Sequence, residues 1–146
     1  MKSNRGFSLL ELLIVVAIIL IIATIAIPSL LRSRQAANES SAVANLRTIN
    51  TAEVTYLSSA GGVFGDATNL VAAGLLDSRF NGNVSGYAFV VTPSGSDYTA
   101  TATPTSTNSG RFGYLSTPDA VVRYQTATSA TCNPCFPTGQ SGAPVQ

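Results

Sequence analysis

A long apolar segment near the N-terminus limits what this chain can fold into more than any other feature. The segment runs from Phe7 to Leu31, and its only charged residue is Glu11. As a helix it would be about 37 Å long, at about 1.5 Å per residue. A hydrocarbon core of about 30 Å is therefore spanned with some tilt. The sequence predicts one membrane-spanning helix, followed by a single globular head.

The charges around this segment indicate its orientation. Lys2 and Arg5 precede it and favour a cytoplasmic N-terminus, although Arg32 and Arg34 beyond it weaken the asymmetry. We therefore expect the rest of the chain to be exported.

A cleaved signal peptide is the simplest alternative, because a basic start, an apolar run and a small residue, Ala26, are all present. However, the run is longer than the roughly 7–15 residues of a typical signal peptide. It also contains Glu11, and a charge costs roughly 2.5–3.5 kcal/mol at mid-membrane depth and less near the interface. Such an acid needs a function.

The helical pattern also continues beyond the apolar segment. Between Arg32 and Ser59 apolar residues recur at steps of three and four, which predicts an amphipathic helix that continues the first. Gly61 and Gly62 then predict its end. Pro28 lacks an N–H and predicts a kink near Thr24. The apolar positions are Ala36, Val43, Leu46, Ile49 and Leu57, and the polar residues Asn38, Glu39, Arg47 and Glu53 lie between them.

The remaining residues predict a small sheet, so the fold class is α+β with an antiparallel meander of three to four strands. A short helix or turn is expected at 66–76 and a turn at 93–96. Tyr87, Phe89 and Val91 are expected to pack on the helix residues Val43, Leu46, Ile49 and Leu57. Threonines alternate in the second strand and are expected to face solvent. The first of the four expected strands begins at Gly86. The other three cover 98–103, 111–116 and 121–125.

Charge and composition exclude several functions. Lys2 and Arg5 are two of the eight basic residues, so the rest of the chain has six basic against seven acidic side chains. This balance gives no support for specific nucleic-acid binding. The chain contains no histidine, which removes the usual general base and the usual metal ligand. We expect neither an enzyme nor a bound cofactor or metal.

Cys132 and Cys135 are the only cysteines. A redox dithiol or half of a metal site is one interpretation, but zinc needs four ligands and the thioredoxin-like strand and helix context is missing. A structural disulfide that closes the Asn133-Pro134 turn is favoured, in an exported and oxidising setting. Asn38 and Asn83 begin N-glycosylation acceptor patterns, which also arise by chance.

The first residues resemble the class III signal of bacterial type IV prepilins. The resemblance rests on Gly6-Phe7-Ser8-Leu9-Leu10-Glu11, the apolar run that follows and Ala26-Ile27-Pro28, and it covers about residues 1–55. It implies that an inner-membrane prepilin peptidase cuts between Gly6 and Phe7 and that the new amine of Phe7 is methylated. Glu11 would then meet the N-terminus of a neighbouring subunit, and Pro28 would weaken the helix in the filament. Many members of the family have a glycine where this chain has Leu20.

The resemblance also implies the organisation and the partners of the chain. The subunit would lie in the lipid bilayer of the inner membrane as a single-pass protein and then enter a helical homopolymer on the cell surface. An assembly ATPase, an inner-membrane platform protein and an outer-membrane secretin would act on it. The expected parts are a leader (1–6), a polymerisation helix (7–31), an amphipathic helix (32–60), a loop and sheet (61–125) and a tail (126–146).

Three functions remain open from the sequence. The first is a type IV pilus subunit used for adhesion, twitching motility or DNA uptake. The second is a pseudopilin of a type II secretion system, which in its major form typically binds calcium through an acidic loop. Asp97 and Asp119 are too isolated in the sequence to indicate such a loop. The third is a monomeric membrane-anchored binding protein.

Overall fold

The computed structural model describes residues 7–127 and 136–145. Gly6, Cys132 and Cys135 lie outside these ranges, so the expectations for them stay predictions. The chain divides into two compact units, of which the first ends at Ser33 and the second begins at Arg34.

Helix α1 (Leu9–Ser59) is 51 residues long and contributes to both units. It begins after Ser8, whose carbonyl oxygen accepts the Leu12 N–H at 3.2 Å. At its other end Gly61 and Gly62 have φ angles of 71° and 88°. The Gly62 N–H donates to the Leu57 carbonyl at 3.0 Å, which satisfies one of the last carbonyls of the helix. The predicted helix end at these glycines is confirmed.

The helix continues through Pro28. Pro28 has no N–H to donate to the carbonyl of Thr24, four residues before it. The Thr24 hydroxyl donates to the Ile21 carbonyl at 2.7 Å. The kink expected near Thr24 stays a prediction.

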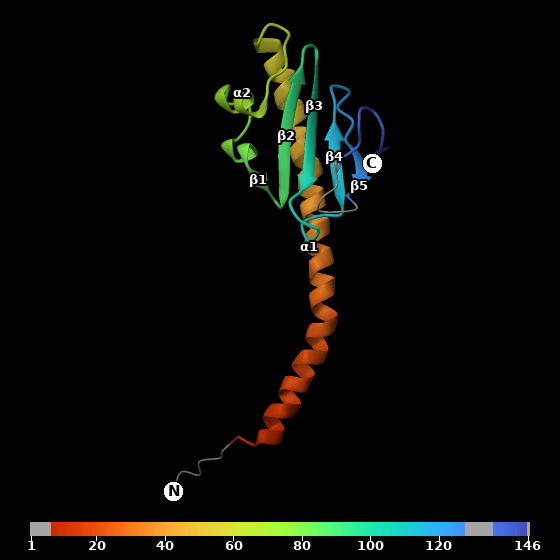
Figure 1. The fold of residues 1–146 in the computed structure, drawn as a ribbon. Coiled ribbons are helices and arrows are strands. Elements are labelled where there is room, and N and C mark those ends of the chain that lie inside the picture. The colour runs from red at the N-terminus through yellow and green to blue at the C-terminus, as the bar shows by residue number, and fades with distance from the viewer. Residues whose placement is uncertain (1–6, 128–135, 146) are drawn as a thin grey trace. The chain divides into compact units, whose positions relative to one another are not determined.

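The second unit contains a sheet in which each strand pairs antiparallel with the next along the chain (Figure 1). The α+β class is therefore confirmed, but the sheet has six strands rather than three to four. The two extra strands have only two residues each, which is too short for a period of two to appear. The strands are β1 (Asn83–Val84), β2 (Tyr87–Ser94), β3 (Asp97–Pro104), β4 (Phe112–Ser116), β5 (Arg123–Thr126) and β6 (Ala143–Pro144).

Two details of the β2–β3 hairpin differ from the sequence prediction. Pro93 and Ser94, expected in the turn, are paired strand residues, so only Gly95 and Ser96 connect the strands. The threonine face is also not fully solvated, because Thr101 is buried and its hydroxyl donates to the Val90 carbonyl at 3.4 Å.

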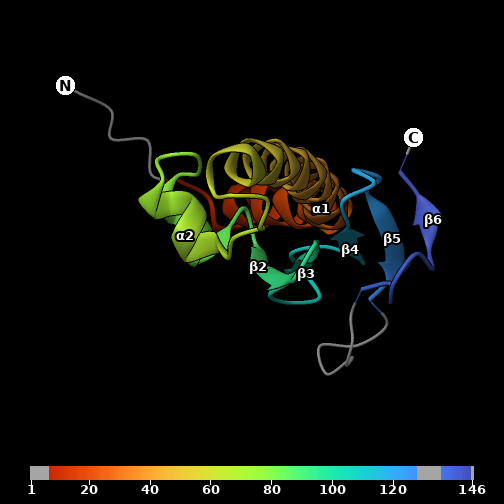
Figure 2. The same cartoon turned by 90° about the horizontal axis from the view of Figure 1, so that it is seen from above.

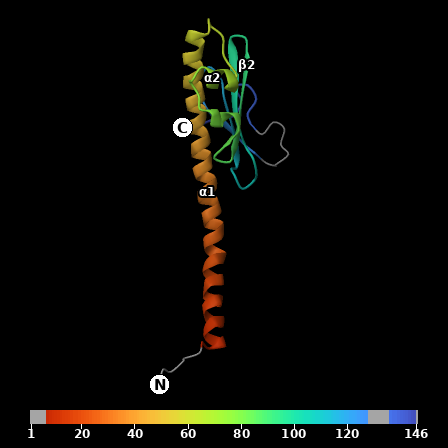
Figure 3. The ribbon, with the colours of Figure 1, turned by 90° about the vertical axis from the view of Figure 1, so that its left-hand side faces the viewer.

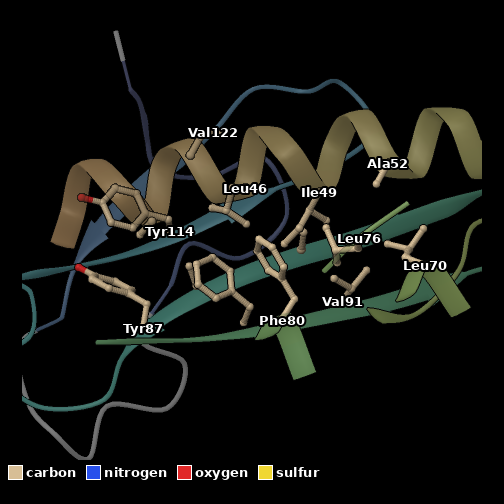
Figure 4. Close-up of a cluster of buried hydrophobic side chains, with 14 of the residues drawn as sticks. Leu46, Ile49, Ala52, Leu70, Leu76, Phe80, Tyr87, Val91, Tyr114 and Val122 are labelled. Carbon is tan, nitrogen blue, oxygen red and sulfur yellow. The ribbon is translucent and has the colours of Figure 1, made fainter. Parts of the chain in front are cut away.

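The part of α1 from Arg34 onward packs against one face of this sheet (Figures 2 and 3). Leu46 and Ile49 are fully buried, and Val43 is partly buried against the core, as predicted. Leu57 is half-buried but outside the core, and Ala36 is exposed. Figure 4 shows Leu46 and Ile49 among side chains of the sheet and of the segment before it.

The segment that joins α1 to the sheet completes this core. It contains α2 (Ala67–Ala72), within the range expected for a short helix, and the 3-10 helix η1 (Ser78–Asn81). Asp66 caps α2 by accepting the Asn69 N–H at 2.8 Å, and Asp77 caps η1 in the same way through Arg79. These caps present Leu70 and Phe80 to the core, where both are buried.

Candidate functional site

The apolar segment of the first unit has no core of its own. Every large hydrophobic side chain from Phe7 to Leu31 is exposed, from 42% at Leu31 to 81% at Leu9. Exposed apolar surface of this extent marks a membrane or protein contact. Within the described ranges, α1 is the one helix that is long and apolar enough to cross a membrane.

Glu11 is the single charge of this segment. It lies in the first turn of α1, where the helix dipole favours a negative side chain. Phe7 lies just before the helix starts, four residues ahead of Glu11, and both are exposed. Glu11 forms no side-chain hydrogen bond or ion pair within the part of the chain that the structure describes. Its carboxylate is therefore free to meet a group from another molecule.

Glu39 differs from Glu11, because both of its carboxylate oxygens accept hydrogen bonds from Arg111. The Arg111 Nε and Nη2 atoms donate to Oε1 and Oε2 at 3.1 and 2.9 Å, and the Arg111 backbone N–H donates to Oε1 at 2.8 Å. The sequence prediction that Glu39 belongs to the polar face was wrong, since this side chain is only 9% exposed. Nearby, Gln35 and Asn38 donate to the carbonyls of Thr107 and Ser109, both at 2.9 Å. These contacts fix the β3–β4 loop on α1.

A second polar cluster lies inside the helix–sheet interface. The Tyr98 hydroxyl donates to Asn50 Oδ1 at 2.8 Å, and Asn50 Nδ2 donates to the Ser116 hydroxyl at 2.8 Å. Burial raises the pKa of Tyr98 far above its usual range, so this side chain stays a neutral donor. The cluster joins α1, β3 and β4 and has no free acid or base for catalysis.

Glu53 is the unusual acid of the head. It was expected on the polar face, but its side chain is fully buried. Oε2 accepts the Gly65 N–H at 3.1 Å, whereas Oε1 has no hydrogen-bond partner among the residues that the structure describes. Burial raises the pKa of Glu53, the Gly65 N–H opposes this rise, and the negative charge of Asp66 adds to it. Tyr98 is the other ionisable group in electrostatic contact with Glu53.

This raised pKa predicts a pH-dependent stability of the head. Because the folded state holds the Glu53 proton more tightly than the unfolded state, stability is fully present below the ordinary pKa of 4.5. It is lost as the pH rises through the higher pKa of the folded state. Glu53→Gln keeps an acceptor for the Gly65 N–H and cannot ionise. This variant should therefore gain stability over the natural protein above pH 4.5 and show little gain below it.

Thermal unfolding of the full chain in detergent, followed by tyrosine near-ultraviolet circular dichroism between about pH 4 and 8, measures this difference. Glu11→Gln is the matched control, because Glu11 lies outside the head and should not change the slope. A Glu53→Gln variant that keeps the natural pH slope would show that the fold does not raise the pKa of Glu53.

The surface hollows in the described part of the head contain few side chains that could bind a metal or catalyse a reaction. Asp97 and Asp119 line one shallow surface hollow, so the fold brings together two acids that are separate in the sequence. Asp119 nevertheless forms an ion pair with Arg123, whose Nη2 lies 2.6 Å from the Asp119 Oδ2. That contact holds the pKa of Asp119 below its usual range. No group of three or more His, Cys, Asp or Glu side chains in the described residues could hold a metal ion.

The structure therefore brings some of the predicted site residues together and not others. Phe7 and Glu11 lie at the start of the exposed apolar segment, with Pro28 further along the same helix. Of the two acceptor asparagines, Asn83 is exposed in β1, whereas the Asn38 side chain is part-buried and bonded to the Ser109 carbonyl. Glu39 and Glu53 are the acids whose burial sequence reasoning missed. They share the helical spacing of Ala42, Leu46 and Ile49, which is a signal that could have found them.

Comparison with known proteins finds similarity that begins in the N-terminal segment. The prokaryotic N-terminal methylation motif matches residues 1–27, which include Gly6, Phe7 and Glu11. The type IV major pilin protein PilA of Myxococcus xanthus is 47% identical over 55 residues, which are 38% of this chain and 25% of that protein. No solved structure gives a significant match.

A second relative extends the likeness through the head. The type IV wide pilus major component PilA4 of Thermus thermophilus is 32% identical over 131 residues, which are 90% of this chain and 94% of that protein. The shared sequence therefore includes both the apolar helix and the sheet that packs on its continuation. The chain belongs to the type IV pilin family.

Proposed function

We propose that this chain is a structural subunit of a type IV pilus that polymerises through the apolar part of α1 into a surface filament. One observation carries the proposal: this part of α1 is exposed on all sides, and its only charge, Glu11, has no partner among residues 7–127 and 136–145. A lipid bilayer can cover the apolar side chains, but it places no fixed cation beside Glu11. A bundle of identical helices covers the same surface and also supplies N-terminal amines.

Processing at the N-terminus produces that amine. A prepilin peptidase cuts between Gly6 and Phe7, and the amine of Phe7 is methylated. Gly6 has no side chain to obstruct the protease. In the filament Glu11 pairs with the Phe7 amine of a neighbouring subunit, and loss of either partner leaves an uncompensated buried charge.

The apolar helices pack together once they leave the membrane. Since lipid and helix surfaces are similarly apolar, close packing rather than water exclusion favours association. Ala17, Ala23 and Ala26 permit close approach of neighbouring helices. Pro28 is a second assembly residue, because the helix lacks one backbone hydrogen bond there. Because the gain per subunit is small, an ATPase and a membrane platform drive assembly, and a secretin passes the filament through the outer membrane.

Before assembly the subunit lies in the inner membrane as a single-pass protein, and after assembly it lies on the cell surface. Its role is structural rather than enzymatic. Both named relatives are pilus components, which favours a pilus over a type II secretion pseudopilus. The filament serves adhesion, twitching motility or DNA uptake. We expect Cys132 and Cys135, which lie outside the described residues, to form a disulfide that closes the tail.

Intact mass and N-terminal sequencing of material sheared from the cell surface test this function. We expect a chain that begins at N-methylated Phe7. If Cys132 and Cys135 form a disulfide, its mass should be two hydrogen atoms below that of the reduced chain. The matched variant Gly6→Leu should leave uncut precursor in the membrane and remove the protein from the sheared fraction. A sheared chain that begins at Met1, or a Gly6→Leu variant that is processed normally, would contradict the assignment.

A further inference from the structure

Two charged residues flank the apolar part of α1, and the helix between them is as long as the hydrocarbon core of a bilayer is thick. Between Glu11 and Arg32 lie residues 12–31, which contain no charged side chain. These 20 residues form a helix of about 30 Å, and a hydrocarbon core is also about 30 Å thick. When Glu11 lies at the cytoplasmic interface, Arg32 therefore reaches the headgroup layer of the opposite leaflet.

Arg32 and Arg34 have no counter-charge within the described part of the chain. Both are exposed, and neither makes a side-chain hydrogen bond or ion pair there. No acid occurs between Glu11 and Glu39, and both oxygens of Glu39 are taken by Arg111. Arg111 and Arg123, in contrast, are each paired with a carboxylate of the head.

The position of these two arginines is unfavourable for a membrane protein with a cytoplasmic N-terminus. Basic residues next to a span favour the cytoplasmic side, so a pair on the exported side opposes the intended orientation. A partner that neutralises them there would offset this cost. Guanidinium groups bind phosphate through two parallel hydrogen bonds, and phosphates form the layer that Arg32 reaches.

We propose that Arg32 and Arg34 bind the phosphate groups of anionic phospholipids in the exported leaflet of the inner membrane. This inference rests on the membrane-stored subunit of the proposed function. Residues two apart in an α-helix point about 200° apart, so the two side chains contact different lipids. The contacts fix the depth of the helix and so hold Glu11 at the cytoplasmic interface, with Phe7 outside the hydrocarbon core. The stored subunit is thereby kept in register for the peptidase, and assembly releases the lipids.

Native mass spectrometry of the full chain tests the proposal. The protein is purified in detergent micelles that contain equal amounts of phosphatidylglycerol and phosphatidylcholine, and the lipids that remain bound are counted. We expect the natural chain to retain phosphatidylglycerol with a preference of about tenfold, which two basic residues at an anionic surface can supply. The preference should fall as the salt concentration rises.

Variants show whether these two residues are responsible. The double variant Arg32→Gln and Arg34→Gln should lose the preference, whereas the corresponding double lysine variant should keep only part of it, because lysine retains the charge but not the paired hydrogen bonds. Arg47→Gln is the matched control, because Arg47 is an exposed arginine of the same helix that lies far from the apolar segment. Equal retention of both lipids by the natural chain would overturn the proposal, and so would an equal loss in the Arg47 variant.

Failure of this inference can be told apart from failure of the proposed function. Lipid retention is measured on the purified single chain and needs no filament. Processing and surface assembly are measured independently by the N-terminal sequence of sheared material. A chain that is processed and sheared normally but shows no lipid preference would contradict only the lipid contact.

Discussion

Replacing Glu11 with alanine is expected to leave the protein in the membrane and to prevent its incorporation into filaments. Removal of the carboxylate cannot harm insertion, because a charged side chain costs up to roughly 2.5–3.5 kcal/mol inside a bilayer. In the filament, however, the amine of a neighbouring Phe7 would lose its counter-charge. Breaking a buried ion pair in this way costs about 3–5 kcal/mol. A loss of this size lowers the affinity for the growing filament by about a hundredfold or more.

Immunoblots of the sheared and membrane fractions measure this effect. We expect the Glu11→Ala subunit to be cut after Gly6 and to accumulate in the membrane, with little in the sheared fraction. Glu11→Asp is the charge-preserving control and should restore part of the filament yield. Leu13→Ala, which removes apolar volume two residues away, should reduce the yield less. A normal yield of filaments from Glu11→Ala would disprove the pairing mechanism.

The parts of the fold that sequence predicted are those set by local signals. Gly61 and Gly62 end α1 because both take the positive φ angles of a helix cap, which glycine adopts without steric cost. The alternation at Tyr87, Phe89 and Val91 predicted a half-buried strand, and these three side chains are buried. Phe7 and Glu11 could be placed at the start of the apolar segment because that segment is one continuous stretch of the chain.

The parts that sequence missed depend on contacts between distant residues. Glu39 and Glu53 were assigned to the polar face, because they lie between the apolar positions chosen from the sequence. Burial of Glu39 is permitted by Arg111, which lies 72 residues away along the chain. Glu53 is held through the Gly65 N–H, a group that no side-chain pattern reveals. Both acids nevertheless share the spacing of Ala42, Leu46 and Ile49, so strict use of the helical period would have placed them on the buried face.

A similar limit applies to the edges of the sheet and to the surface acids. β1 and β6 have two residues each, so their existence is decided by pairing with β2 and β5 and not by their own composition. Asp97 and Asp119 share a hollow only because the chain returns through β4. Such proximity cannot be predicted until the order of the strands is known.

Gly110→Ala is expected to be among the most damaging single substitutions in the head. A Cβ atom built at this position would lie 2.6 Å from Cζ and 2.9 Å from Cε2 of the Tyr87 ring, and it would also collide with the hydroxyl. Tyr87 is fully buried, and its hydroxyl donates to the Phe112 carbonyl at 2.9 Å. The ring can move only by breaking that bond or by displacing the core. Overpacking of this kind typically costs about 1–3 kcal/mol, and we expect the upper end because the ring has no free space.

Thermal unfolding of Gly110→Ala against Gly82→Ala separates this collision from the general effect of replacing a glycine. Gly82 has a φ angle of −140°, which alanine adopts without strain, and a Cβ there would meet only the Arg79 carbonyl oxygen at 3.8 Å. Gly82→Ala should therefore unfold close to the natural temperature, whereas Gly110→Ala should unfold well below it. Tyr87→Phe removes the colliding hydroxyl, so the double variant with Gly110→Ala should lose less stability than the sum of the two single losses. Strict additivity, or equal stability of the two alanine variants, would mean that Tyr87 does not occupy the space beside Gly110.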